Sequence, residues 1–161
     1  MSLLPIFQWI EATGFAVAIN ESLYAFALIE SLHLIALAVI GGAVLIVDLR
    51  LFGVGFHRQS VADVARAARP WLIGSLITIL VTGFLLFSSL AASKYYYNFA
   101  YWWKMYCLLA AIIFTFTIRQ PFALRVPATA DAPSGRAKGI ASLSILLWLG
   151  VAVMGRAIGF I

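Results

Sequence analysis

Long apolar stretches alternate with short polar ones along the whole chain. There are four apolar stretches, at about residues 23–52, 71–92, 99–118 and 139–160. Because a helix of about 20 apolar residues crosses the hydrocarbon core of a bilayer, each stretch is long enough to span a membrane. The pattern predicts an all-α fold, a four-transmembrane-helix bundle that forms one integral membrane domain over residues 1–161.

The residues before the first span follow a different pattern. Apolar side chains recur at roughly helical spacing over residues 5–18, but Gln8 and Glu11 interrupt them. Trp9 is a residue type that concentrates at headgroup level. We therefore expect a short N-terminal helix lying in the membrane interface. The segment lacks the basic start of a signal peptide, so no cleavage is expected.

The segments between the spans contain turn and cap signals. Ser60-Val-Ala-Asp63 has the form of a capping box, which predicts a short surface helix over 61–68 that stops before Pro70. A tight loop is expected at 93–98. Residues 119–138 are rich in Pro, Ala and small polar residues and indicate a flexible loop.

Composition and charge support a membrane protein. Hydrophobic residues make up 64% of the chain and charged residues 11%, and the mean hydropathy is +1.03. A soluble domain has about a quarter charged residues. The net charge of +5 does not indicate nucleic-acid binding, because the basic residues lie at the ends of spans. Most of them flank the connections after the first and third spans, so the positive-inside rule predicts that both termini lie outside.

His33 is the feature that most suggests a function. It is the only ionisable residue between Glu30 and Asp48, inside the first span. Burying an ionisable side chain in a membrane costs free energy, and such residues usually have a function. Histidine is a common axial ligand of haem iron, and Glu30, one turn earlier, could orient the ring. The alternative without a cofactor is a structural histidine that is hydrogen-bonded to Glu30 or to a hydroxyl on the second span.

The first span has two distinct sides. Leu37 and Gly41 follow His33 at helical spacing and could form an apolar wall for a flat cofactor. Ala38 and Gly42 lie on the other side in the small-xxx-small form of close helix packing. On the second span, Thr78 belongs to a stripe of small residues that could face the same cofactor or serve packing alone.

Two further side chains could take part in a haem site. Lys104 lies near the start of the third span, and it could snorkel, pair with Glu30 or Glu21, meet a haem propionate, or bind iron as a neutral amine. Met154 is a candidate sixth ligand. His57 lies roughly 36 Å from His33 along a continuous helix, so the two cannot share one iron.

Asp48 and Arg50 mark the far end of the first span. They are expected to anchor the helix at the cytoplasmic interface, and a role in proton delivery stays open.

The order of these residues resembles that of a known family. The chain is similar to an uncharacterised family of small bacterial four-helix membrane proteins. The residues that carry the resemblance are, in order, His33-Leu, Gly42, Asp48-Leu-Arg50-Leu-Phe52 and Lys104. That resemblance implies a bacterial cytoplasmic (inner) membrane. More distantly, the chain resembles HemJ-type protoporphyrinogen oxidases, in which a histidine and a lysine are associated with haem b, and CopD-type membrane proteins. By this resemblance His33 and Lys104 would be haem-site residues, although Val47-Asp48-Leu49 stands where HemJ-type proteins have Tyr-Leu-Pro.

Together these features predict a haem b-binding membrane protein in which His33 is the iron ligand. Electron transfer with quinone or a redox protein partner is the expected function. The alternatives are a cofactor-free accessory or structural subunit, in which the polar residues fix helix register, and a HemJ-like porphyrinogen oxidase. A homo-oligomer is also open, since the small-residue stripes could be contacts between protomers.

Overall fold

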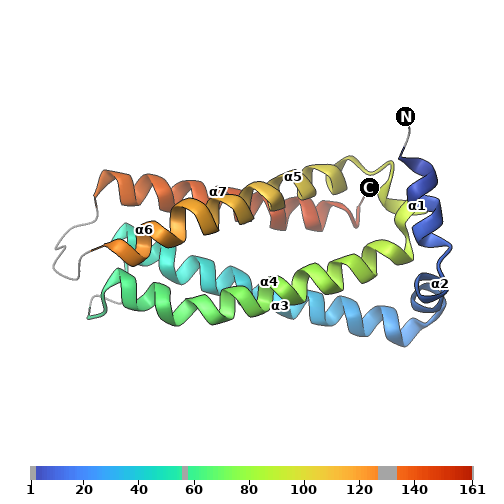
Figure 1. Ribbon diagram of the computed structural model, residues 1–161, viewed down its shortest axis with the longest axis horizontal. Helices are drawn as coiled ribbons and strands as arrows, with labels where there is room; N and C mark the ends of the chain where they lie inside the picture. The colour runs from blue at the N-terminus through green and yellow to red at the C-terminus, as the bar shows by residue number, and fades with distance from the viewer. Residues whose placement is uncertain (1–2, 56–57, 127–133, 161) are drawn as a thin grey trace.

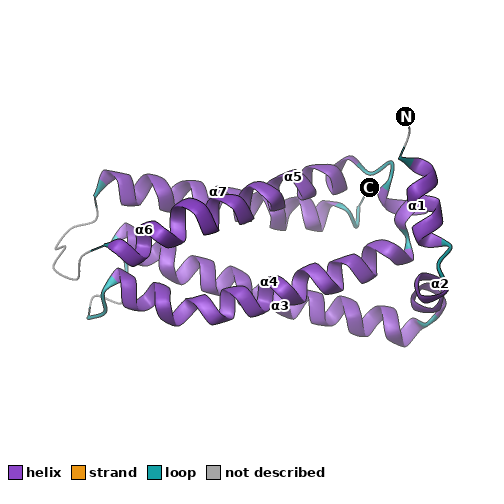
Figure 2. Ribbon diagram, viewed as in Figure 1, coloured by secondary structure: helices purple, strands orange, loops and turns teal. Residues whose placement is uncertain are grey.

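The computed structural model describes residues 3–55, 58–126 and 134–160, and within these residues helices are joined by short turns and loops with no strand (Figure 2). Four helices are long and apolar enough to cross a membrane. They are α3 (Leu23–Phe52), α4 (Val61–Ser89), the continuous helical stretch Phe99–Arg125, and α7 (Gly135–Ala157). The predicted fold class is confirmed, and the chain is a multi-pass membrane protein.

The bundle consists of two helix pairs that pack against each other. α3 lies along α4, and α5 (Phe99–Phe114) lies along α7, while α3 also contacts α7 (Figure 1). Both chain ends lie at the same end of the bundle, where α1 (Leu4–Glu11) and α2 (Gly14–Glu21) cross it. Which side of the membrane this end faces stays a prediction.

Each membrane-spanning helix begins at a polar cap. Ser22, Ser60, Asn98 and Ser134 precede the four spans, and each side chain accepts a hydrogen bond from a backbone N–H three residues later. Such caps satisfy amide groups that the first helical turn leaves free. The first span ends at Gly53, whose φ of 82° is readily adopted only by glycine. The first span therefore has the predicted bounds.

The second span is longer than predicted. α4 runs unbroken from Val61 through Pro70, so the expected surface helix over 61–68 and the break before Pro70 are wrong. Val64 and Ala68 lie on the same buried face as Leu72. Their packing outweighs the one backbone hydrogen bond that Pro70 cannot donate.

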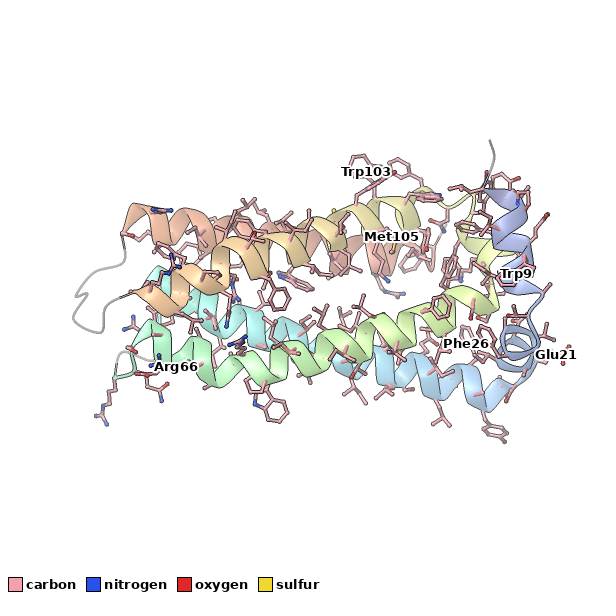
Figure 3. The ribbon with its side chains drawn as sticks, viewed as in Figure 1. Trp9, Glu21, Phe26, Arg66, Trp103 and Met105 are labelled. Atoms are coloured by element: carbon pink, nitrogen blue, oxygen red, sulfur yellow. The ribbon has the colours of Figure 1, made fainter. Side chains whose placement is uncertain are left out.

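The N-terminal segment forms two helices where one was predicted. α1 and α2 are separated at Thr13, whose backbone is extended and whose hydroxyl donates to the Ile10 carbonyl at 2.6 Å. Glu11 holds α1 on the bundle, because its carboxylate accepts hydrogen bonds from the backbone N–H groups of Ala92 and Ser93. These two residues belong to η1 (Ala91–Tyr95), a π-helical turn after α4. In Figure 3, Trp9 and Glu21 lie on this end and Arg66 at the opposite end.

The third span also extends beyond its prediction. After α5, the helix continues through the π-helical turn η2 (Thr115–Arg119) into α6 (Gln120–Arg125), so part of the expected flexible loop is helical. Residues 127–133 of that loop lie outside the described residues. π-turns inside helices often occur at functional sites, and η2 carries two fully buried polar side chains, Thr115 and Arg119.

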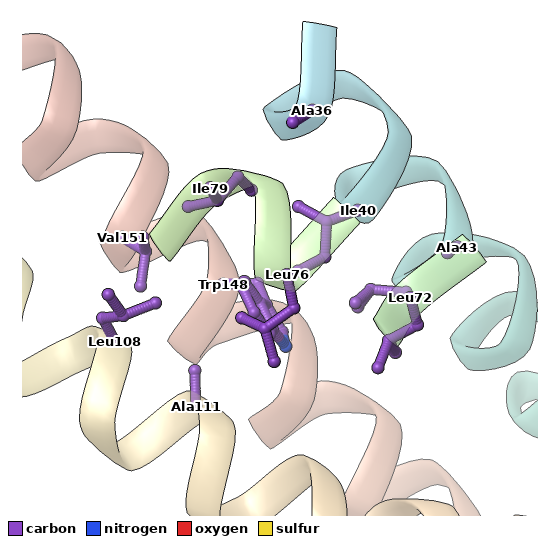
Figure 4. Close-up of a cluster of buried hydrophobic side chains, with 11 residues drawn as sticks. Ala36, Ile40, Ala43, Leu72, Leu76, Ile79, Leu108, Ala111, Trp148 and Val151 are labelled. Carbon is purple, nitrogen blue, oxygen red and sulfur yellow. The ribbon is translucent and has the colours of Figure 1, made fainter. Parts of the chain in front are cut away.

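Apolar side chains fill the bundle in two clusters. One lies in the middle, where all four spans contribute (Figure 4). The second lies toward α6 and includes Val47, Leu51, Phe114 and Ile140. The two clusters thus occupy the middle and the α6 end, whereas aromatic rings around Phe7 and Phe87 pack at the end covered by α1 and α2.

Candidate functional site

Three polar side chains lie one helical turn beyond the central cluster, toward α1 and α2. The last apolar layer on this side consists of Ala36, Ile79, Leu108 and Val151, one from each span. Stepping three or four residues along each helix keeps the same face. The next layer consists of His33 on α3, Thr82 on α4, Lys104 on α5, and Met154 and Gly155 on α7.

The His33 ring packs against α4. Its Nδ1 lies 2.8 Å from the Thr82 hydroxyl oxygen. A Cβ placed on Gly83 would lie 3.2 Å from His33 Cε1, so glycine at this position leaves room for the ring. Glu30 is exposed, and no hydrogen bond joins it to His33 in the described part of the chain. Of the two partners predicted for His33, the hydroxyl on the second span is the one found.

The hydrogen bonds of Thr82 determine which nitrogen of His33 carries the proton. The Thr82 hydroxyl lies 2.6 Å from the Thr78 carbonyl oxygen, to which it donates its only proton. It can therefore only accept from His33, which must donate through Nδ1–H. A neutral ring then has its lone pair on Nε2. For Nε2 the described residues provide no hydrogen-bond partner.

Lys104 lies across the bundle from this ring. Its stem runs over Gly155, where an added Cβ would be 3.6–3.8 Å from the last three atoms of the side chain. Helical stepping places Lys104 and His33 in the same layer of the bundle. Within the described residues Lys104 forms no salt bridge, so the predicted ion pairs with Glu30 and Glu21 are not formed.

The other predicted site residues are distributed around this layer. Leu37 and Met154 are half-buried, and Leu37 packs on the central cluster. Thr78 contributes its carbonyl to the Thr82 hydroxyl, while its own hydroxyl donates to the Gly74 carbonyl. Gly41 is exposed and has open space around it.

The predicted packing face of the first span does not pack inside the chain. Ala38 and Gly42 are exposed. Together with Trp71 of α4, which is 66% exposed, they line a groove of about 390 Å³ on the outside of the α3–α4 pair.

The sequence interpretation missed a buried ion pair at the other end of the bundle. Asp48 and Arg119 both have 0% exposure, and Arg119 Nε donates to Asp48 Oδ1 at 2.6 Å. The expectation that Arg119 lies in a loop is wrong, because it lies in the helical turn η2. Asp48 was expected to anchor the helix at the interface, and the structure shows it paired inside the bundle. One feature of the sequence could have predicted this pair. Asp48 and Arg119 each adjoin an apolar stretch, so each could be buried inside the bundle.

The described residues contain no group of three or more His, Cys, Asp or Glu side chains that could hold a metal ion. Among the described residues His33 is the only histidine, so a site there would contain a single imidazole. His57 lies outside the described residues.

Comparison with known proteins identifies the family of this chain. Residues 6–161 match the model of a family of unknown function, DUF6644, and the chain belongs to that family. No curated protein and no solved structure matches the chain. The resemblance to HemJ-type and CopD-type proteins stays a prediction.

Proposed function

We propose that this member of the DUF6644 family binds haem b through His33 Nε2 and transfers electrons at the end of the bundle covered by α1 and α2. The observation that carries the proposal is the hydrogen bond between His33 Nδ1 and Thr82. A ligating histidine commonly donates its other ring N–H to a nearby acceptor, which fixes the tautomer and the ring orientation. Thr82 supplies that acceptor inside a membrane span.

The surroundings of His33 agree with a single axial ligand. Haem iron needs one or two protein ligands, unlike the four of a structural zinc site. In this proposal Lys104 would meet a propionate with its ammonium, or would bind the iron as a neutral amine. When bound, haem would supply one-electron redox chemistry, and the chain would position it and set its electrostatic surroundings.

Quinone or a redox protein is the proposed electron partner. His33 lies in the half of the bundle toward α1 and α2, and either partner would approach from that end.

A cofactor-free accessory subunit is the competing proposal, and one observation favours it. The His33–Thr82 hydrogen bond joins two neighbouring spans, and it would fix their register without any cofactor.

Absorption spectra of the purified protein separate the two proposals. Protein purified in mild detergent from cells supplied with haem should show a Soret band, which His33→Ala removes and His57→Ala retains. Protein that stays colourless after haem is supplied would rule out the haem proposal.

Two threonine variants provide a sharper test, because they differ by one turn on the same helix. Thr82→Val removes the acceptor of His33 Nδ1–H, and loss of such a partner typically lowers affinity about 10- to 100-fold. Thr78→Val removes a hydroxyl that bonds only its own helix and leaves the backbone carbonyl in place. Haem titration should show weaker binding for Thr82→Val alone, whereas equal binding by the two variants would contradict the assigned tautomer.

A further inference from the structure

The buried ion pair has polar atoms that the described residues leave without a partner. Arg119 donates from Nε to Asp48 and from Nη2 to the Val44 carbonyl, each at 2.6 Å. Asp48 Oδ2, Arg119 Nη1 and Ser144 Oγ are buried and have no partner in the described part of the chain. Burying such atoms costs free energy unless something bonds to them.

Ser144 belongs to the same cluster. It lies on α7, is fully buried, and its hydroxyl faces the Asp48 carboxylate. The two groups are close enough to interact. The geometry of a direct hydrogen bond is not met, because Ser144 Oγ and Asp48 Oδ2 both have no partner in the described part of the chain. When two polar groups approach in this way without bonding, a bridging water is the usual explanation.

The charges of the cluster limit what can bind there. An anion would meet the Asp48 carboxylate, and a cation would meet the Arg119 guanidinium. A neutral molecule that both donates and accepts suits all three atoms. Water meets this requirement, and buried waters typically form about three hydrogen bonds to otherwise unsatisfied groups.

We propose that Asp48, Arg119 and Ser144 form an internal water-binding site in the third span's π-turn region. One water bridges Asp48 Oδ2 and Ser144 Oγ. Arg119 Nη1 lies on the edge of the guanidinium away from Nε–H. A second water therefore accepts a hydrogen bond from Nη1. These waters link α3, η2 and α7 inside the bundle, where the described residues leave these polar atoms without partners.

This site is independent of the proposed haem function. His33 and Asp48 are fifteen residues apart on α3, which is roughly 22 Å along a helix. The central cluster, including Ile40, Leu76 and Ala111, lies between them.

Three substitutions of Ser144 test the bridging water by the order of their stabilities. Ser144→Asn places an amide where the water would be, with both a donor for Asp48 and an acceptor. Ser144→Val fills similar space without either group. Ser144→Ala leaves the water in place with one partner fewer. We expect the thermal midpoint in detergent to fall in the order Asn, Ala, Val, with the Asn variant near the unsubstituted protein.

A direct Ser144–Asp48 hydrogen bond would give a different order. Asn would then overpack the site and unfold below Ala, and this result would overturn the proposal. If none of the three variants folds, a second measurement still tests the proposal. A high-resolution structure of the unsubstituted protein should show density within hydrogen-bond distance of both Asp48 Oδ2 and Ser144 Oγ, and direct contact between those atoms would overturn the proposal.

Discussion

The Asp48–Arg119 pair allows a quantitative prediction about the stability of the bundle. Asp48→Asn keeps the size of the side chain but leaves the Arg119 guanidinium without its counter-ion, at 0% exposure. Removing one member of a buried ion pair typically costs about 3–5 kcal/mol, because the other charge stays desolvated. We expect a loss of that size in the free energy of unfolding.

The measurement is a titration with denaturing detergent, followed by circular dichroism in mixed micelles. Asp63→Asn is the matched control, because Asp63 pairs with Arg66 at the surface, where the side chains are 57% and 62% exposed. Exposed pairs contribute little, so the control should barely change the midpoint.

The double variant Asp48→Leu/Arg119→Met completes the experiment. It removes both charges, so its loss of stability should be smaller than the sum of the losses of Asp48→Leu and Arg119→Met, each measured alone. The reasoning is refuted if Asp48→Asn costs no more than Asp63→Asn. It is refuted equally if the single losses add in the double variant, because the charges would then not interact.

Three further predictions concern the other end of the bundle. Gly83→Ala should weaken haem binding and lower the thermal midpoint, because the new methyl group would lie 3.2 Å from the His33 ring, while Gly74→Ala, in open space, should do neither. Lys104→Met should keep the Soret band but alter its position or the reduction potential if the amine meets the haem, and an unchanged spectrum and potential would place Lys104 outside the site. Glu11→Gln should weaken the attachment of α1, since a neutral amide oxygen accepts less strongly from the Ala92 and Ser93 amides. Hydrogen exchange at residues 92–96 should then be faster, with no change at the Asp48 end; equal protection would show that α1 is held by Phe7 and its aromatic neighbours instead.

The number and position of the spans could be predicted because hydropathy alone determines them. A helix in lipid must satisfy its own backbone groups, so about 20 apolar residues specify a span without knowledge of its neighbours. The errors occur where tertiary contacts decide. Pro70 usually ends a helix, but here Val64 and Ala68 before it and Leu72 after it share one buried face.

The candidate site was predictable in part for the same reason. His33 and Lys104 are unusual by composition alone, and helical periodicity places each on a face. Their partners depend on how the helices pack. Nothing in the sequence distinguishes Thr82 from Thr78 as the partner of His33, since the two are four residues apart on one stripe. The Asp48–Arg119 pair joins residues 71 positions apart, so it required the packing of the first span against the third.

The two embedded polar groups differ in a way that separates function from stability. Asp48 and Arg119 form an ion pair and are fully buried, so their contribution is to the folded state. His33 is half-buried, and its Nδ1 is occupied by Thr82 while the described residues leave Nε2 without a partner. If the purpose of His33 were only to join α3 to α4, a residue with one hydrogen-bonding atom would serve as well. His33→Gln, which can still reach Thr82 but lacks the ring nitrogen, should therefore keep the thermal midpoint and lose the Soret band. If His33→Gln keeps both the thermal midpoint and the Soret band, His33 is not the iron ligand, and its role is in helix packing.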